Sequence, residues 1–138
     1  MQNPFHLCII DDDDIYRFTI IQSAKFSKIE HKTSVFPNGE EAITCITDNL
    51  NNPDNLPHLI LLDIDMPIMD GFQFLKDYQA IESKLSRPIS IYMVSSSVDP
   101  EDIEKAKSYT SVVDYLSKPL KSDKLKEIME RTLQNLNV

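Results

Sequence analysis

The stretch that decides the fold is Leu59-Ile60-Leu61-Leu62-Asp63-Ile64-Asp65. It opens with four apolar residues in a row, without the alternation of apolar and polar side chains that marks a half-exposed strand. A strand without a polar face is buried on both sides, as in a parallel sheet that helices cover on both faces. The run ends in acidic residues, so it indicates an α/β protein with carboxylates at the end of a buried strand.

Similar apolar runs recur along the chain and predict the remaining strands. We expect strands over residues 7–10, 32–36, 58–62, 89–94 and 112–116. A helical pattern follows each of these runs. Strands that alternate with helices five times predict right-handed crossovers and a doubly wound parallel sheet. No second domain, repeat or linker is evident, and we expect a single domain over residues 1–138.

The helix boundaries can be read from capping residues and apolar spacing. The first helix is expected over about residues 14–27, with a core face of Tyr16, Ile20 and Ala24. The third is expected to begin near residue 74. Asn38, Asp99 and Ser122 are expected to cap the second, fourth and fifth helices, because their side chains can accept from free backbone N–H groups. The polar stretch over residues 48–57 predicts the end of the second helix and a surface connection.

Composition excludes several classes of function. The chain has 138 residues, with 14 Lys and Arg against 22 Asp and Glu, so its formal net charge is −8. This acidity argues against direct nucleic-acid binding. With two glycines, neither GxGxxG nor a Walker A loop can be written. No apolar stretch approaches the ~20 residues of a membrane span. No signal peptide is evident, and we expect a cytoplasmic protein without a membrane partner.

Polar residues follow four of the expected strands. Acidic residues occupy 11–14 and recur at Asp63 and Asp65, serines occupy 95–97, and Ser117-Lys118-Pro119 follows the last strand. In open α/β sheets, ligands bind beyond the carboxyl ends of the strands. We therefore expect these four groups to meet at one edge of the sheet.

The combination of residue types at this edge indicates a particular chemistry. Clustered carboxylates repel one another, and a hard dication such as Mg²⁺, which prefers oxygen ligands, relieves the repulsion. A lysine and a hydroxyl beside them can neutralise and bind phosphoryl oxygens. Together these groups favour phosphoryl transfer onto a carboxylate.

Four motifs, each following an expected strand, carry a resemblance over essentially the whole chain. They are Ile9-Ile10-Asp11-Asp12 with Arg17 beyond, Leu61-Leu62-Asp63-Ile64-Asp65-Met66-Pro67-Ile68-Met69-Asp70-Gly71, Val94-Ser95-Ser96, and Tyr115-Leu116-Ser117-Lys118-Pro119. With these motifs the sequence resembles the receiver domain of two-component response regulators. The resemblance implies a flavodoxin-like (βα)5 fold with strand order 2-1-3-4-5, of the stand-alone, chemotaxis-receiver-like type without an output domain.

The resemblance also implies a role for each matching residue. Asp63 would be the phosphoacceptor. Mg²⁺ would be bound by Asp11, Asp12, Asp63 and the backbone carbonyl of Asp65. Ser95 and Lys118 would contact the phosphoryl oxygens, and Tyr115 would be the switch aromatic that moves inward when Ser95 engages phosphate. The bond between Lys118 and Pro119 would be cis.

The same resemblance implies the partners and the type of activity. The phosphoryl donor would be a sensor histidine kinase or a histidine phosphotransfer protein. A downstream protein would bind the face built by the fourth helix, the fifth strand and the fifth helix. Self-phosphorylation and autodephosphorylation at Asp63 are expected, and turnover of a separate substrate is not.

Two other functions compete with this interpretation. Asp63-Ile64-Asp65 is also similar to the nucleophile motif of haloacid-dehalogenase-type phosphatases, but that motif normally opens the fold and here follows the third strand. A degenerate receiver that only binds partners is the second alternative. The intact set of Asp11, Asp12, Asp63, Ser95 and Lys118 argues against it.

Overall fold

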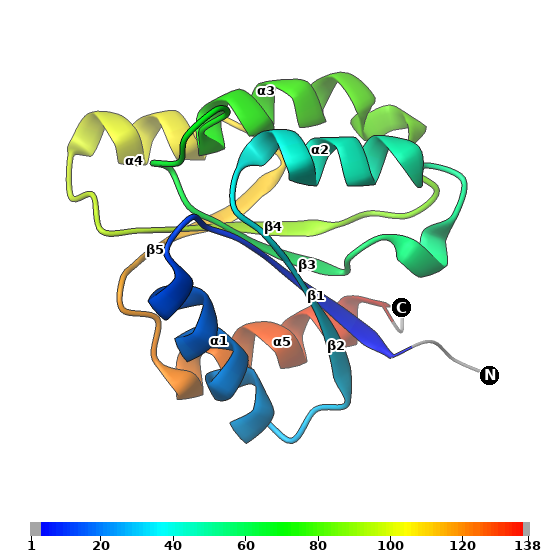
Figure 1. The fold of residues 1–138 in the computed structure, drawn as a ribbon, viewed down its shortest axis with the longest axis vertical. Helices are drawn as coiled ribbons and strands as arrows, with labels where there is room; N and C mark the ends of the chain where they lie inside the picture. The colour runs from blue at the N-terminus through cyan, green and yellow to red at the C-terminus, as the bar shows by residue number, and fades with distance from the viewer. Residues whose placement is uncertain (1–3, 137–138) are drawn as a thin grey trace.

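A computed structural model describes residues 4–136 and shows five strands alternating with five α-helices (Figure 1). The elements are β1 (Phe5–Ile10), α1 (Asp14–Phe26), β2 (His31–Phe36), α2 (Gly39–Asp48), β3 (Leu59–Leu62), α3 (Gly71–Ile81), β4 (Ser90–Ser95), α4 (Pro100–Lys107), β5 (Val112–Ser117) and α5 (Ser122–Leu136). Short 3-10 helices cover Pro53–Asn55 and Glu82–Lys84. No helix in the described part of the chain is long and apolar enough to cross a membrane.

The strands form one parallel sheet in the order β2-β1-β3-β4-β5, which confirms the predicted fold class and strand order. Helices α2, α3 and α4 cover one face, while α1 and α5 cover the other (Figure 1). The carboxyl ends of all five strands therefore lie at the same edge of the sheet. This edge is the one that the sequence predicts to carry the site.

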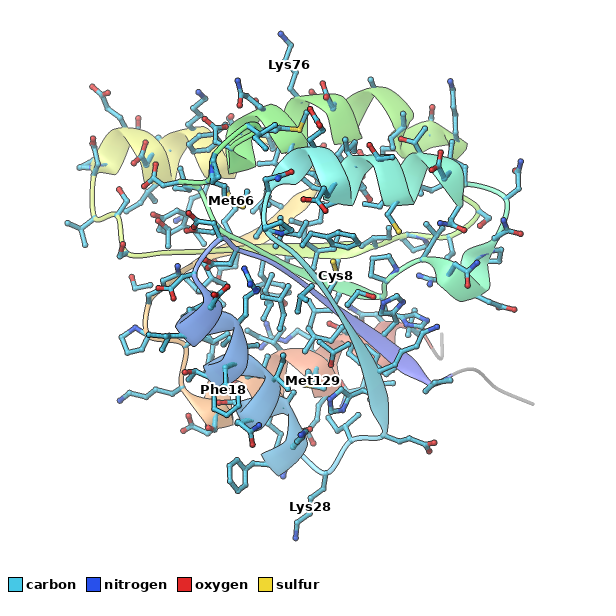
Figure 2. All side chains as sticks on the ribbon, in the orientation of Figure 1. Cys8, Phe18, Lys28, Met66, Lys76 and Met129 are labelled. Atoms are coloured by element: carbon cyan, nitrogen blue, oxygen red, sulfur yellow. The ribbon has the colours of Figure 1, made fainter. Side chains whose placement is uncertain are left out.

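The β3 strand is buried on both faces because its apolar residues alternate between two cores. Ile60 and Leu62 pack into the cluster under α2 and α3, which also contains Cys8. Leu59 and Leu61 pack into the cluster under α1 and α5, which also contains Met129. Figure 2 labels Cys8 in the sheet and Met129 on α5. All four β3 residues are buried, which confirms the prediction made from their unbroken apolar run.

Two of the three predicted helix caps are confirmed. The Asn38 side chain accepts from the Glu41 N–H at 3.0 Å, and Asp99 accepts from the Glu101 N–H at 3.0 Å. The prediction for Ser122 is wrong, because α5 already includes this residue. Its hydroxyl instead donates to the Ser23 hydroxyl on α1 at 3.2 Å. The Ser122 side chain therefore joins α5 to α1 and does not cap α5.

The predicted surface connection between α2 and β3 is confirmed, and Arg87 binds three of its backbone carbonyls. Arg87 donates from Nη1 to the Pro57 carbonyl at 3.0 Å and from Nη2 to the Pro53 carbonyl at 2.9 Å. It also donates to the carbonyl of Leu56, a residue that is fully buried. Backbone carbonyls that loops leave unpaired are costly unless a donor reaches them. Arg87 provides that donor for a polar segment beside the amino-terminal end of β3.

Two histidines at this same end of the sheet are expected to make the protein sensitive to acid. The backbone N–H of His6 donates to His58 Nδ1 at 2.9 Å, and the ring Nε2 of His6 lies 2.6 Å from the Ser34 hydroxyl. Burial lowers the pKa of His6 to about 4, with Lys32 adding to the shift, and burial also lowers the pKa of His58 to about 4, with Arg87 adding. A protonated Nδ1 on His58 could no longer accept the His6 N–H.

The sign of the effect follows from these pKa values. The folded-state pKa of His6 lies below the ordinary value of 6.5, so its stabilising contribution is complete above 6.5 and is lost as the pH falls toward 4. In urea unfolding between pH 7 and pH 4.5, wild type should therefore lose about 1 to 3 kcal/mol more than a variant without the His6 imidazole. His6→Gln, which does not titrate, should lose less over the same interval. An equal loss in the variant would contradict the assignment.

Candidate functional site

Strand register places the first two carboxylates of the site side by side. Ile10 on β1 pairs with Leu62 on β3, and the next residues along the two strands are Asp11 and Asp63. The Asp63 N–H continues the ladder by donating to the Ile10 carbonyl at 3.0 Å. Asp11 and Asp63 therefore leave neighbouring strands at the same level, as the sequence predicts for residues that follow paired strands.

Asp11, Asp12 and Asp63 form a compact acidic group. One oxygen from each carboxylate lies within 4.8 Å of the others. Asp11 and Asp63 are buried, with exposed fractions of 2% and 8%, whereas Asp12 is exposed. Three converging carboxylates, two of them buried, match the oxygen donors that Mg²⁺ prefers. The donor set fits a divalent cation.

Lys118 supplies the positive charge of the site. Its Nζ lies 2.8 Å from Asp11 Oδ2 and 3.5 Å from Asp63 Oδ1. Burial opposes the charged ammonium, but the hydrogen bond to Asp11 and the charge of Asp63 outweigh it and raise the pKa of Lys118. The lysine therefore stays charged between the two buried carboxylates. Its peptide bond to Pro119 is cis, as expected.

Burial makes Asp63 easier to protonate than an ordinary aspartate in the metal-free protein. Burial raises the pKa of Asp63 to about 6, and the negative charge of Asp11 adds to the shift. Lys118 and the hydrogen bond with the Ile64 backbone act in the opposite direction. A cation bound by the acidic group would change this balance toward the carboxylate.

Hydrogen bonds from the start of α1 fix Asp11 in place. Its Oδ1 accepts from the Asp13 N–H at 2.9 Å, and its backbone carbonyl accepts from Arg17 Nη1 at 2.6 Å. Arg17 also pairs with the carboxylate of Asp14. Asp13 caps the helix by accepting from the N–H groups of Ile15 and Tyr16. The acidic run thus combines two carboxylates of the site with two that fix the helix beginning there.

Ser95 and Tyr115 are linked to the site through the loop between β4 and α4. The Ser95 carbonyl accepts from the Lys118 N–H at 2.9 Å, and its hydroxyl accepts from the Ser97 N–H at 3.1 Å. The half-buried Tyr115 donates its hydroxyl to the Ser97 carbonyl at 2.8 Å. Ser97 also donates its own hydroxyl to Asp102 on α4 at 2.7 Å. Ser95, Tyr115 and the beginning of α4 therefore share one loop.

The loop from β3 to α3 carries the remaining predicted site residue and one strained residue. Asp65 is exposed in this loop. Ile68 has a φ of 68°, in the left-handed region that a β-branched side chain rarely adopts, and it is 73% exposed. Next to it, the Met69 carbonyl accepts from the Gly39 N–H at 2.9 Å, which joins the loop to α2.

Replacing Ile68 by Asn is expected to stabilise the protein by about 1 kcal/mol, because Asn tolerates this φ with less strain. The free energy of unfolding in urea would measure the change. Val98→Asn is the matched control, since Val98 is 79% exposed and is not among the non-glycine residues of positive φ. A gain in the Val98 variant as large as that of Ile68→Asn would show that relief of strain is not the cause.

Sequence reasoning misses one residue that the structure places at the site. The sequence predicts Tyr16 only on the core face of α1, and it does pack against the core that α1 covers. Its ring also lies under Lys118, with Nζ 4.2 Å from the ring centroid. Burial raises the pKa of Tyr16, with the charges of Asp11 and Asp63 adding, so its hydroxyl stays protonated. No sequence signal distinguishes a core tyrosine from one that also faces the site.

Comparison with known proteins identifies the family. Residues 7–130 match the response regulator receiver domain. The chain belongs to this family. A solved structure of a two-component response regulator from Cytophaga hutchinsonii superposes on this receiver domain with a TM-score of 0.79 and 26% identity, covering 96% of this chain and 99% of that one.

Curated relatives are regulators of different lengths. A protein named as a methanogenesis regulatory protein, FilR2 of Methanothrix harundinacea, is 25% identical over 129 residues, covering 94% of this chain and 81% of the relative. The transcriptional regulatory protein ZraR of Salmonella typhimurium is 30% identical over 125 residues, covering 91% of this chain. This receiver domain spans only 26% of the length of ZraR.

Proposed function

We propose that this receiver domain accepts a phosphoryl group on Asp63 in a Mg²⁺-dependent reaction and signals through the change of shape that follows. The observation that carries the proposal is the meeting of Asp63 with Asp11, Asp12 and Lys118. Three carboxylates lie close enough to share a cation, and an ammonium lies 3.5 Å from Asp63 Oδ1. This arrangement meets the two needs of phosphoryl transfer, which are positioning and neutralisation of charge.

The acidic group would hold the metal through Asp11, Asp12, Asp63 and the backbone carbonyl of Asp65. When bound there, Mg²⁺ supplies positive charge that neutralises phosphoryl oxygens and favours the ionised form of Asp63. The Asp63 carboxylate is the nucleophile. Its oxygen forms a bond to phosphorus while the bond from phosphorus to the donor's leaving group breaks, and that group departs with the electron pair.

Lys118 and Ser95 have supporting roles in the same reaction. The Lys118 ammonium pairs with the phosphoryl oxygens as a compact positive charge. The Ser95 hydroxyl donates to a phosphoryl oxygen, which requires it to turn from the Ser97 N–H that it accepts from here. Tyr115 is bonded to the same Ser97, so a movement of this loop changes the environment of the tyrosine. This connection supports a switch that links Ser95 and Tyr115.

The proposed partners are the protein that donates the phosphoryl group and the protein that binds the phosphorylated form. A sensor histidine kinase or a histidine phosphotransfer protein in the cytoplasm would supply the phosphoryl group. The added charge of about −1.5 to −2 would shift the population of the β4–α4 loop and of Tyr115. A downstream protein would then bind the face formed by α4, β5 and α5, where Val113 is 53% exposed. No turnover of a separate substrate is part of the proposal.

A small acyl phosphate tests the proposal without a partner kinase. The protein is incubated with acetyl phosphate and MgCl₂, and its intact mass is measured. We expect a gain of one phosphoryl group that does not form when EDTA replaces the metal. A wild-type protein that never gains mass would refute phosphoacceptor chemistry and favour a receiver that only binds partners. Continuous hydrolysis of a phosphomonoester would instead favour a phosphatase.

A further inference from the structure

Tyr16 is fixed at the site by the first turn of α1. Its N–H donates to the Asp13 carboxylate at 3.2 Å, the same carboxylate that accepts from Ile15. The half-buried ring packs against the core between the sheet and the helices α1 and α5. The cap therefore fixes the backbone of Tyr16, and the packing against the core restricts its ring.

Within residues 4–136, the structure gives the Lys118 ammonium three contacts, and they differ in kind. Two are to the carboxylates of Asp11 and Asp63, at 2.8 and 3.5 Å. The third is the face of the Tyr16 ring, whose centroid lies 4.2 Å from Nζ. The negative face of an aromatic ring attracts an ammonium, most strongly where water is excluded. The ring is the only uncharged group among these three contacts.

We propose that Tyr16 is a positioning residue that holds the Lys118 ammonium beside Asp63 through the face of its ring. The inference rests on the proposed function, because it assigns Lys118 to the phosphoryl oxygens. In that reaction Asp11 is taken by the metal and Asp63 becomes an acyl phosphate, so both carboxylates change partner. The ring contact does not depend on either carboxylate, and it keeps the ammonium at the site throughout.

The surroundings of the Tyr16 hydroxyl allow the role of the ring face to be separated from that of the hydroxyl group. The Tyr16 hydroxyl oxygen is buried and has no hydrogen-bond partner within residues 4–136. A buried hydroxyl without a partner stabilises nothing, so its removal costs little. Tyr16→Phe should therefore keep the function of the residue, because Phe retains the ring face. Tyr16→Leu removes the face and should lose that function.

The test combines the rate of phosphorylation with an NMR measurement that reports the position of the Lys118 side chain. Wild type, Tyr16→Phe and Tyr16→Leu are compared for the rate of mass gain with acetyl phosphate and Mg²⁺. We expect a loss of about tenfold for Tyr16→Leu and a change of less than about twofold for Tyr16→Phe. NMR of the metal-free proteins should show Lys118 side-chain protons shifted upfield by the ring current in wild type and Tyr16→Phe, but not in Tyr16→Leu.

A matched control lies on the same helix. Phe18, labelled in Figure 2, is 62% exposed. Phe18→Leu also removes an aromatic ring from α1, but at a position away from Lys118. It should change neither the rate nor the Lys118 shift. If thermal unfolding shows that Tyr16→Leu does not fold, Tyr16→Met fills more of the volume and replaces it in both measurements.

The outcomes distinguish this proposal from the proposed function. An equal loss in Tyr16→Phe and Tyr16→Leu would overturn the role of the ring and assign it to the hydroxyl. Absence of an upfield shift in wild type would also overturn it. A wild-type protein that gains no mass would refute phosphorylation at Asp63, while the Lys118 shift in the three proteins would still decide whether the ring positions the ammonium.

Discussion

Asp63→Asn is expected to abolish the mass gain with acetyl phosphate completely. The substitution keeps the size of the side chain but removes the anionic oxygen that would attack phosphorus. Asp63 lies in the acidic group and beside Lys118, whose Nζ is 3.5 Å from its Oδ1. Other carboxylates near the site, including Asp11 and Asp12, should not take its place if they serve to bind the metal. Intact mass with saturating Mg²⁺ measures the result.

The same variant is expected to be more stable than wild type when no metal is present. Burial and the charge of Asp11 raise the pKa of Asp63 to about 6, so the carboxylate that prevails at pH 7.5 is less favourable in the folded protein than in the unfolded chain. Asn carries no charge and avoids this cost. The net shift already includes the attraction to Lys118, and its size corresponds to a gain of about 1 to 3 kcal/mol in urea unfolding at pH 7.5.

Asp77→Asn is the matched control for both measurements. Asp77 is exposed on α3, away from the strand ends, so its replacement should leave the mass gain and the stability unchanged. A phosphoryl adduct that persists in Asp63→Asn would place the phosphoacceptor elsewhere. A loss of stability in Asp63→Asn would mean that the attraction between Asp63 and Lys118 outweighs burial and the repulsion by Asp11.

The two central acids of the site could be placed from sequence because strand ends carry positional information. Asp11 and Asp63 each follow an unbroken apolar run, and a parallel sheet aligns the carboxyl ends of such runs. The pairing of Ile10 with Leu62 shows this alignment directly. Lys118 follows in the same way, since Ser95 pairs with Ser117 on the neighbouring strand. Residues that directly follow a strand of the parallel sheet are thus the most predictable part of the site.

Contacts that depend on packing between elements could not be predicted. Tyr16 lies on the core face of α1, and the helical period alone cannot show that this face also meets Lys118. Serine is a residue type that commonly caps helices, yet the Ser122 hydroxyl on α5 forms a hydrogen bond to Ser23 on α1. The pairing of His6 with His58 likewise joins residues 52 positions apart, and it depends on the register of β1 against β3.

Gly71→Ala is expected to damage both the fold and the site. A Cβ at this position would lie 2.2 Å from the carbonyl oxygen of Asp63 and 3.1 Å from the Cα of Ile64. Both are backbone atoms, held because the Gly71 N–H donates to the Ile64 carbonyl at 2.8 Å. Gly71 does not have a positive φ, so the need for glycine is one of space and not of backbone conformation.

The backbone must move to admit this methyl group, and the residue that it displaces is Asp63. Overpacking of this severity against backbone should cost about 3 kcal/mol or more in urea unfolding. A displacement of about 1 Å should slow mass gain with acetyl phosphate about 100-fold in the fraction that folds. Gly39→Ala is the comparison, because a Cβ there lies no closer than 3.0 Å to Met69 and Phe74. It should cost less stability and leave the rate closer to wild type, since the atoms that it crowds are not those of Asp63. Equal effects on the rate from both variants would show that the close packing of Gly71 does not position the phosphoacceptor.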